Sequence, residues 1–555
     1  MRLQMPVDSV TIMDYFVGVD VGTGSVRAAL VTSNGRIKKV ATCPLEIFHP
    51  APNFYEQSSD NIWSAVCHVV KSVVAEISAE DVKGIGFDAT CSLVAIDKTG
   101  SPVTISLTGQ EKQNVILWMD HRAHEEADFI NSIGHDILQY VGGKVSLEMQ
   151  TPKMLWLKKN LPTSWNSAAL LFDLPDFLTW KATESESRSL CSLVCKWNYS
   201  ANPNGKNEWN EDFFEQLNLR DLKKDNWRKI GNDVRAPGDA IEPGLSAKAA
   251  TELGLLKGTP VGTSLIDAHA GGLGMIGCYA PDVSSNFSNR LALICGTSTC
   301  HMIVNENKIF VNGVWGPYYS AMVPGFWLNE GGQSATGKLL DHIIETHPAT
   351  PGILKSLGGN KHIQQYLSEL LHLIAEQKNL QNVSYLTKDI HVWPDFHGNR
   401  SPLADPTLKG MISGLSLSVD QENLALLYLA TLQALTYGTK HIIETLTTAG
   451  HNIETILVCG GLSQNQLFIQ IQADVLALPV LCPVERESVL LGSAILGACA
   501  TKKYSMHETI KRMAGLSNIV KPTSDCYKYH FRKYRVFKKM VQDQQDYKKI
   551  MSEEL

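Results

Sequence analysis

The sequence carries nearly the same glycine turn twice, once in each half of the chain. Residues 22–25 read Gly-Thr-Gly-Ser and residues 296–299 read Gly-Thr-Ser-Thr, and each turn stands between apolar stretches that favour β-strands. Glycine lets backbone N–H groups approach an anion closely, and the hydroxyl groups add hydrogen-bond donors. The repeat therefore predicts two related halves whose turns together hold the polyphosphate of a nucleotide such as ATP. The residues of the two turns are Gly22, Thr23, Gly24 and Ser25, then Gly296, Thr297 and Ser298.

Length and charge narrow the class of protein. The chain has 555 residues, which exceeds the ~250–300 residues at which a single core stops growing, so we expect at least two domains. A hydrophobic content of 44%, a charged content of 19% and a net charge of −6 are typical of a globular protein and lack the basic excess of a nucleic-acid binder. We therefore expect no nucleic-acid partner.

The sequence predicts neither a membrane span nor a targeting signal. The longest apolar stretch, residues 489–500, is shorter than the ~20 residues of a spanning helix and is typical of a buried helix. Residues 1–14 have no sustained apolar run and resemble neither a signal peptide nor a transit peptide. Twelve irregularly spaced cysteines, none in a Cys-x-x-Cys pair, argue against a disulfide framework. We expect a cytoplasmic protein with reduced thiols and no membrane partner.

Two residue pairs come nearest to a metal-ligand spacing. They are Cys191 with Cys195 and His121 with His124. A metal site is the less favoured interpretation of each pair, because plain packing or surface placement explains such isolated pairs more often.

Strand-like and helix-like patterns alternate in both halves, which predicts an α/β fold. Strands at 15–19 and 26–32 flank the first turn, and strands at 291–295 and 300–304 flank the second. The expected organisation, in chain order, is a leader at 1–13, an N-terminal domain at 14–272, a hinge at 273–290, a C-terminal domain at 291–502 and a helical tail at 503–555.

Two charged residues frame the first turn. Asp20 ends the strand before the turn, where its carboxylate can reach a Mg²⁺ ion that bridges nucleotide phosphates. Arg27 follows the turn and carries a permanent, fork-shaped charge that suits a terminal phosphate. The alternatives are a turn-capping role for Asp20 and a surface salt bridge for Arg27. The repeated turn favours the functional interpretation of both.

Asp267 is the candidate catalytic base. It follows the apolar stretch 261–266, and small residues come directly after it, which leaves room for a ligand. A carboxylate held there can accept the proton of a hydroxyl that attacks a γ-phosphoryl group. The competing interpretation is the N-cap of a helix. The two phosphate turns in the same chain favour the base.

A third glycine motif follows the strand-like residues 456–459. Glycines at the start of a helix let a flat adenine lie against the backbone, and the polar residues that follow can bond to it, although the motif alone is weakly specific. Its candidate residues are Gly460, Gly461, Ser463, Gln464 and Asn465.

Taken together, these motifs resemble those of the FGGY family of carbohydrate kinases, within the actin-like, ribonuclease H-like ATPase superfamily. Residues 20–25 with Arg27 look like the first phosphate motif of the family, residues 296–299 like the second, and residues 460–465 like the adenosine segment. Asp267 lies where these kinases keep their catalytic aspartate. The resemblance implies two actin-like ATPase domains on either side of a central nucleotide cleft, with ATP and Mg²⁺ as cofactors.

Within the family, the sequence is most similar to ribulokinases of the eukaryotic D-ribulose type. The segments that carry this similarity are 88–92, 118–122, 267–269, 330–333 and 395–402. The resemblance implies that Asp267 takes the proton from the 5-hydroxyl of D-ribulose while ATP phosphorylates that oxygen. It also implies a set of sugar-binding residues, namely Ala89, Asp120, Lys196, Asp267 and Glu330.

Other interpretations stay open. The phosphate turns do not discriminate D-ribulose from L-ribulose, xylulose or a pentitol, so the specificity rests on similarity. A non-catalytic ATP or sugar sensor on the same fold is a second alternative, against which the retained Asp267 argues. The sequence does not decide the oligomeric state, for which a homodimer is one alternative.

Overall fold

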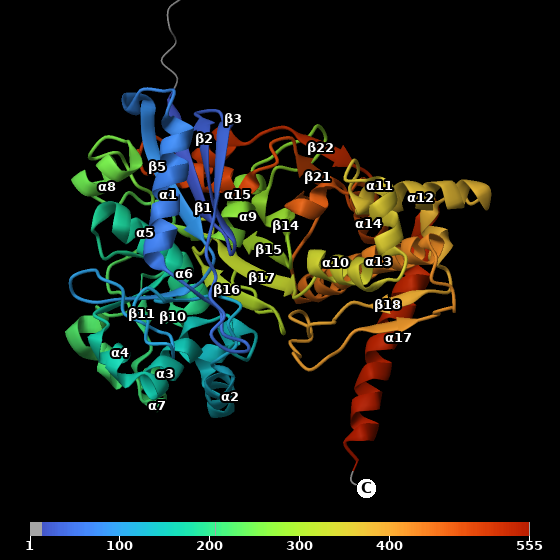
Figure 1. The fold of residues 1–555 in the computed structure, drawn as a ribbon, viewed down its shortest axis with the longest axis horizontal. Helices are drawn as coiled ribbons and strands as arrows, with labels where there is room; N and C mark the ends of the chain where they lie inside the picture. The colour runs from blue at the N-terminus through green and yellow to red at the C-terminus, as the bar shows by residue number, and fades with distance from the viewer. Residues whose placement is uncertain (1–13, 206, 554–555) are drawn as a thin grey trace, which may run out of the picture.

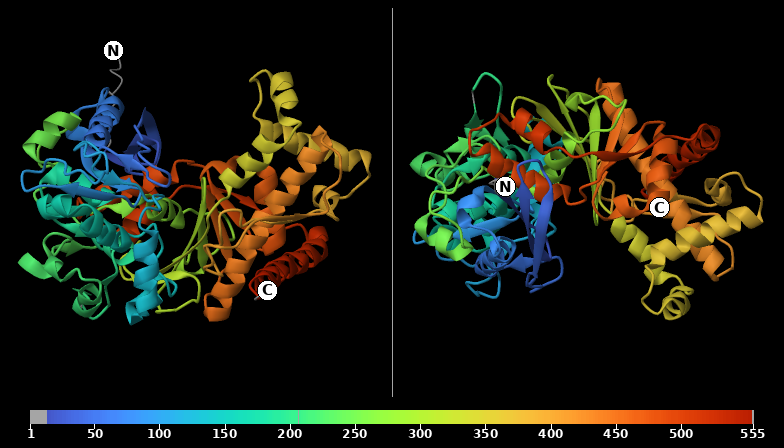
Figure 2. Two further views of the ribbon diagram at one scale, coloured as in Figure 1. Left: turned by 60° about the horizontal axis from the view of Figure 1, so that its bottom comes forward. Right: turned by 90° about the horizontal axis from the view of Figure 1, so that it is seen from above.

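The structure is a computed structural model that describes residues 14–205 and 207–553. Two lobes lie side by side, one formed mainly by the blue to green N-terminal half and the other mainly by the yellow to red C-terminal half (Figure 1). The first described strand, β1, belongs to the first lobe, and the last described helix, α17, belongs to the second (Figure 1 and Figure 2). The leader expected at 1–13 lies outside the described residues.

The first lobe is built on a five-stranded sheet in the order β13-β5-β1-β2-β3. Three antiparallel strands form a meander, and β5 and β13 continue the sheet parallel to β1. The valine face of α1 covers this sheet. The bounds are β1 (Tyr15–Val21), β2 (Ser25–Thr32), β3 (Ile37–Pro44), α1 (Ser59–Val74), β5 (Val82–Ala89) and β13 (Leu265–Ile266).

The second lobe is built on a seven-stranded sheet in the order β16-β17-β15-β14-β20-β21-β22. The meander β14-β15-β17 is antiparallel, and β20 and β21 continue the sheet parallel to β14. The bounds are β14 (Arg290–Cys295), β15 (Thr299–Asn305), β16 (Trp315–Tyr319), β17 (Trp327–Gln333), β20 (Thr455–Cys459), β21 (Val480–Pro483) and β22 (Ser517–Val520).

The two sheets repeat one plan. In each lobe an antiparallel meander is followed by two further strands parallel to its first strand. The first glycine turn connects β1 to β2, and the second connects β14 to β15. Because each turn follows the carboxyl end of the strand that pairs in parallel with its neighbour, the turns occupy equivalent places in the two lobes. This duplication agrees with the sequence prediction of two related halves.

One helix from the second half of the chain belongs to the first lobe. Helix α15 (Ser488–Cys499) packs on β1 and β5 so closely that a Cβ atom at Gly18 or Gly86 would collide with its backbone. Helix α9 (Asp267–Ile276) packs against the other side of α15, where Gly274 lies against Ser488. Figure 1 shows α15 beside β1. The first lobe therefore completes its core with residues from the far end of the chain.

The expected domain boundaries need correction at three points. Residues 273–276 continue α9, so the irregular hinge expected from residue 273 cannot begin before Gly277. Helix α15 lies in the segment 291–502 but packs with the first lobe. The tail at 503–555 is not helical throughout, because β22 extends the second sheet.

The remaining elements surround these sheets. In the first lobe they are β4 (Glu56–Gln57), β6 (Leu93–Ile96), β7 (Val115–Ile116), α2 (His124–Ile133), α3 (Gln150–Asn160), α4 (Pro162–Ser167), β8 (Leu170–Asp173), α5 (Leu174–Thr183), β9 (Arg188–Ser189), α6 (Leu190–Lys196), β10 (Tyr199–Ser200), β11 (Glu208–Trp209), α7 (Glu211–Gln216), β12 (Val234–Arg235) and α8 (Ala247–Leu253). Those that follow are α10 (Gly337–Thr346), α11 (Thr350–Leu357), α12 (Ile363–Gln377), β18 (His391–Trp393), β19 (Met411–Ser413), α13 (Gln421–Ala449), α14 (Gln466–Leu476), α16 (Met506–Met513) and α17 (Tyr527–Met551).

Among the described residues, no helix combines the length and apolar character that crossing a bilayer requires. The expected cytoplasmic location and the homodimer stay predictions.

Candidate active site

In each glycine turn, the N–H of the first glycine closes the hairpin, although the first turn is one residue longer than the second. The Gly22 N–H donates to the Ser25 carbonyl at 3.0 Å, and the Gly296 N–H donates to the Ser298 carbonyl at 2.9 Å. A Cβ atom at Gly24 would meet no heavy atom within 4 Å, and one at Gly296 would meet none nearer than 3.8 Å. Both turns thus present their backbone to open space, as a phosphate-binding turn requires.

The neighbours of the first turn hold it in place. The Trp118 indole donates to the Thr23 hydroxyl at 2.9 Å, and the Gln57 amide donates to the Thr23 carbonyl at 2.8 Å. In the second turn, Thr297 is exposed, while its carbonyl accepts from the Thr336 N–H at 2.9 Å. The side chain of Thr23 is therefore partly engaged within the protein, whereas that of Thr297 faces solvent.

Asp20 and Arg27 form an ion pair across β1 and β2. Two guanidinium nitrogens of Arg27 donate to Oδ2 of Asp20 at 3.0 and 2.6 Å, and a third lies 2.6 Å from Oε2 of Glu487. Both carboxylates compete with any phosphate for Arg27, so a phosphate contact requires an exchange of partners. Sequence reasoning did not single out Glu487, because only the folded chain brings the residue before α15 beside the first turn.

Asp88 is a third acidic residue near the first turn, where the carboxyl ends of β1 and β5 lie side by side. It pairs in register with Asp20, since β5 runs parallel to β1. Burial and the charge of Asp20 raise the pKa of Asp88 well above its usual value, although a hydrogen bond from Ser493 opposes the rise. No side-chain role was predicted for Asp88. Its place at the end of a buried strand parallel to that of Asp20 was the available signal.

Asp267 opens α9 directly after β13. Because β13 runs parallel to its neighbour β5, Asp267 lies with Asp20 and Asp88 at the carboxyl ends of these strands. We call the site formed by these three residues the acidic edge. Its Oδ1 accepts from the Ala268 N–H at 2.7 Å, and Ile266 rather than Asp267 occupies the N-cap position. Burial and the charge of Asp20 raise the pKa of Asp267 to about 7. A carboxyl group with this pKa can take up a proton near neutral pH.

Lys196 and Glu330 bring the two halves of the chain together at a buried polar cluster. The Lys196 ammonium, at the end of α6, lies 4.4 Å from the centroid of the Trp315 ring, and Trp315 pairs with Glu330 between β16 and β17. Burial alone would raise the pKa of Glu330, but the charge of Lys196 helps to hold it below its usual value. Oε2 of Glu330 is buried without a hydrogen-bond partner among the described residues. The pair can therefore offer one donor and one acceptor to a polar ligand.

A second ion pair, between Arg400 and Glu148, lies near Lys196 and Glu330. Arg400, from the segment between β18 and β19, lies 2.6 Å from Oε1 of Glu148, which precedes α3 of the first lobe. Both side chains are largely buried. Arg400 also helps to lower the pKa of Glu330. The two lobes thus share charged contacts on the same side of the molecule as Lys196 and Glu330.

The two remaining predicted sugar contacts differ in their surroundings. Ala89 ends β5, buried in register between Val21 and Ile266, and so adjoins the acidic edge. Asp120 is engaged within the protein: Oδ1 accepts from the backbone and side chain of Arg122 at 2.9 Å, and Oδ2 accepts from Arg122 and the Tyr55 N–H at 2.7 Å. Asp120 therefore holds Arg122, and its expected contact with a sugar stays a prediction.

The third glycine motif has a different shape from the one expected. Gly460 has φ 87°, and a Cβ atom there would collide with the Cys295 carbonyl, which precedes the second turn. A 3₁₀ helix, η6 (Gly461–Gln464), follows, and α14 begins only after Asn465. This motif and the second turn therefore lie side by side.

Most polar groups of this motif are used locally. The Ser463 hydroxyl donates to the Gly460 carbonyl at 2.7 Å. Asn465 caps α14 by accepting from the Phe468 N–H at 3.1 Å and donates to the Tyr428 hydroxyl. Gln464 and Gly461 are exposed. Of the predicted adenine contacts, Gln464 and the Gly461 backbone are the groups best placed for a ligand.

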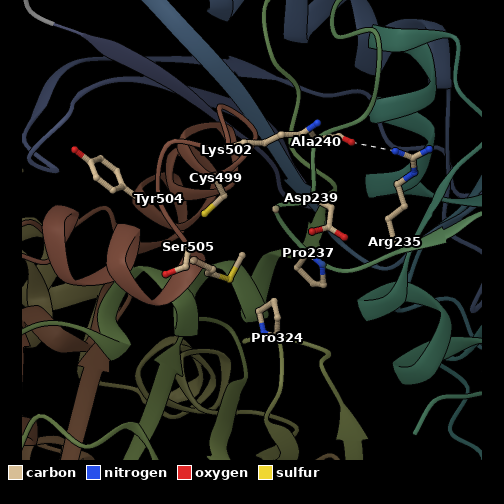
Figure 3. A pocket seen from close by; sticks show the side chains of 11 residues that line it. Arg235, Pro237, Asp239, Ala240, Pro324, Cys499, Lys502, Tyr504 and Ser505 are labelled. Atoms are coloured by element: carbon tan, nitrogen blue, oxygen red, sulfur yellow. Dashed lines mark hydrogen bonds between the residues drawn. The ribbon is translucent and has the colours of Figure 1, made fainter. Parts of the chain in front are cut away.

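One pocket of about 510 Å³ lies elsewhere in the molecule (Figure 3). It is lined by residues such as Arg235, Asp239 and Pro324, together with Cys499 and Lys502 near the end of α15. Helix α15 has 12 residues, which span ~18 Å at 1.5 Å per residue. The pocket thus lies at the opposite end of α15 from Glu487 and contains none of the predicted site residues.

Comparisons with known proteins show the family of this chain. The description of the FGGY family of carbohydrate kinases, N-terminal domain, matches residues 15–274, and that of the C-terminal domain matches residues 291–501. The chain is 52% identical to a human FGGY carbohydrate kinase domain-containing protein, over 97% of this chain and 98% of the relative. It is 40% identical to a D-ribulokinase of Saccharomyces cerevisiae, over 90% of this chain and 74% of the relative.

A solved structure shows the same fold. The crystal structure of Plasmodium falciparum glycerol kinase with ADP aligns with a TM-score of 0.74 and 16% identity, over 96% of this chain and 98% of the other. The two-lobed architecture is the actin-like ATPase fold of this family. The chain belongs to the FGGY family of carbohydrate kinases. It is an ATP-dependent sugar kinase with the two-domain fold of that family.

Proposed function

We propose that this kinase transfers the γ-phosphoryl group of ATP to the primary 5-hydroxyl of a ketopentose, and that D-ribulose is the preferred sugar. The observation that carries the proposal is the position of Asp267. Its charge interacts with Asp20 beside the first glycine turn and with Lys196 and Glu330 in the buried polar cluster. A carboxyl group between a phosphate-binding turn and a polyol-binding cluster is suited to a hydroxyl that attacks a phosphoryl group.

The choice of D-ribulose draws on one relative and on the chemistry of the cluster. The yeast protein named D-ribulokinase is 40% identical to this chain. A sugar needs donors and acceptors that replace its hydration, and a buried site rejects analogues that leave its polar groups unpaired. Lys196 supplies a donor and Glu330 an acceptor, and Arg400 with Glu148 borders them. The stereochemistry of the sugar follows from the relative alone.

In the proposed reaction, the sugar hydroxyl oxygen forms a bond to the γ-phosphorus as the bond from that phosphorus to the β,γ-bridging oxygen breaks. The hydroxyl proton passes to the carboxylate of Asp267, and ADP leaves with the bridging oxygen. Because Oδ1 of Asp267 accepts from the Ala268 N–H, Oδ2 is the oxygen free to take the proton. In this proposal, the backbone N–H groups of the two turns hold the phosphates, and the exposed side chain of Gln464 contacts the adenine.

The acidic edge fits a Mg²⁺ ion. Asp20 and Asp88 present carboxylate oxygens, the ligand type that Mg²⁺ prefers. Oδ1 of Asp88 is buried without a hydrogen-bond partner among the described residues, and the charge of Asp20 raises the pKa of Asp88. Asp20 and Asp88 would hold the ion, which when bound neutralises charge on the nucleotide phosphates.

The test of specificity is a coupled assay of ADP release over D-ribulose, L-ribulose, D-xylulose, L-xylulose and a set of pentitols. We expect kcat/KM to be highest for D-ribulose by at least about tenfold, the difference that ~1.4 kcal/mol of differential transition-state binding produces. Phosphorus NMR of the product should show a phosphate monoester on the 5-oxygen.

A higher kcat/KM for another sugar would refute the D-ribulose assignment and leave the kinase class intact. Asp282→Asn serves as a matched control throughout, because Asp282 is an exposed loop residue in the chain segment after α9. A chain that binds ATP and sugars but releases no ADP with any of them would be a sensor, and the proposed reaction would be wrong.

A further inference from the structure

Two cysteines and a histidine meet in the interior of the first lobe, next to the buried polar cluster. Cys191 and Cys195 lie on α6, and His269 lies on α9. Their ligand atoms all lie within 4.8 Å of one another, and all three residues are buried. Sγ of Cys195 lies 3.4 Å from Nε2 of His269. None of these three residues has a part in the proposed phosphoryl transfer.

The spacing along α6 explains why both thiols face the histidine. Residues four apart lie on the same side of an α-helix, so Cys191 and Cys195 point in one direction. His269 is the third residue of α9 and projects toward them. Nε2 of His269 faces Sγ of Cys195, and the ring nitrogen of a neutral imidazole can donate a lone pair to a cation.

A fourth donor is close by. Oε2 of Glu330 lies 3.7 Å from Nε2 of His269 and has no hydrogen-bond partner among the described residues. Two thiolates, an imidazole and a carboxylate together make a set of ligands that Zn²⁺ accepts in a tetrahedral arrangement. The unpartnered Glu330 oxygen is an observation independent of the cysteine spacing.

We propose that Cys191, Cys195 and His269 form a binding site for Zn²⁺, with Glu330 in reach as the fourth ligand. Binding releases two thiol protons to solvent. One dication with two thiolates is neutral, and the carboxylate of Glu330, bound as the fourth ligand, adds one negative charge that the nearby ammonium of Lys196 offsets. Neutrality matters here, because burial penalises an isolated thiolate. The site goes beyond the proposed function, since it requires no sugar or nucleotide, but it shares Glu330 with the proposed sugar site, so Zn²⁺ and the sugar would compete for this carboxylate.

The proposal is tested with Cd²⁺ as a spectroscopic substitute for Zn²⁺. The full-length chain, freed of metal by chelation and kept reduced with a phosphine, is titrated with Cd²⁺ while the ultraviolet cadmium–thiolate charge-transfer band is followed. We expect the band to saturate at one equivalent per chain, and Zn²⁺ to displace it. Because the readout is the metal–sulfur bond, its outcome is independent of whether the proposed kinase reaction is correct.

Three variants assign the band to its ligands. Cys191→Ser and Cys195→Ser should each lose the one-equivalent band, because an alcohol does not replace a thiolate as a ligand at neutral pH. Cys67→Ser is the matched control, since Cys67 is a free, half-buried cysteine on α1. The control should keep both the band and its stoichiometry.

A second measurement needs no variant and so does not depend on the folding of a core substitution. X-ray absorption at the zinc edge of the wild-type chain with one equivalent of Zn²⁺ should show two sulfur ligands at about 2.3 Å and a nitrogen ligand at about 2.0 Å. A first shell of oxygen atoms alone would overturn the proposal. A band that persists unchanged in the Cys191→Ser, Cys195→Ser double variant would overturn it as well.

Discussion

Ser493 of α15 donates a hydrogen bond to Oδ2 of Asp88 at the end of β5, across 405 residues of sequence. Burial and the charge of Asp20 raise the pKa of Asp88, and this bond favours the ionised form against them. The second half of the chain therefore helps to set the charge of a carboxylate in the first lobe. If Asp88 holds Mg²⁺ as proposed, Ser493 supports the metal without touching it.

The variant Ser493→Ala tests this relationship. Loss of the donor should raise the Mg²⁺ concentration for half-maximal activity about tenfold, because a hydrogen bond to a charged group is worth ~1.5 kcal/mol or more. The measurement is initial rate against free Mg²⁺ at saturating ATP and sugar. Thr501→Ala is the control, since the Thr501 hydroxyl donates only to the Ala498 carbonyl beyond the end of α15. If the Mg²⁺ dependence of Ser493→Ala is unchanged, Asp88 does not hold the metal.

Asp267→Asn tests the catalytic base. An amide cannot accept the hydroxyl proton, so kcat should fall by about 10²–10⁴, while the sugar Kd from calorimetry stays within about threefold. The exposed Asp282→Asn should keep the kcat of the wild type. Near-normal turnover in Asp267→Asn would remove Asp267 from the base role.

The pH dependence of kcat carries an independent prediction. Burial and the charge of Asp20 raise the pKa of Asp267 to about 7, and a general base works only when it is deprotonated. Therefore kcat should rise with pH over about one unit on either side of that pKa and level off above it. The measurement is kcat at saturating substrates from acidic to mildly alkaline pH. A rise centred near the ordinary aspartate pKa would contradict it.

Two adjacent glycines give a matched pair of variants. Gly460 has φ 87° and touches the Cys295 carbonyl, whereas a Cβ atom at Gly461 would meet nothing within 4 Å. Gly460→Ala should lower the free energy of unfolding by ~1–3 kcal/mol, because a residue with a side chain is strained at this positive φ. It should also raise the KM for ATP, since the second turn follows Cys295. Gly461→Ala should change neither value strongly. Melting curves and ATP titrations of both variants provide the comparison.

Much of the fold was predictable because its signals are local. The two glycine turns, their flanking strands and the buried stretch at 489–500 each appear within a few residues of sequence, and the structure has the corresponding elements. The place of α15 was not predictable in the same way. Its residues are apolar on all sides, so the pattern indicates burial but does not say which lobe buries it.

The candidate site shows the same limit. Asp20 and Asp267 end apolar strands, which drew attention to them, and the structure puts both at one sheet edge with Asp88. Asp120 and Asn465 both lie in segments that resemble family motifs, yet both make hydrogen bonds within the protein. Asp120 accepts from Arg122, and Asn465 caps the start of α14. A motif states which residue is present, but only the folded chain shows which of its atoms are already used.

The docking of α15 on the first sheet has a consequence for how the protein is made. During synthesis, more than two hundred residues follow the N-terminal family match before α15, the helix that covers β1 and β5, is made. The core of the first lobe is therefore incomplete until most of the chain has been synthesised. A fragment that stops at the end of the N-terminal family match would expose that glycine-rich sheet face to water. We therefore expect that such a fragment would not form a stable first lobe without α15.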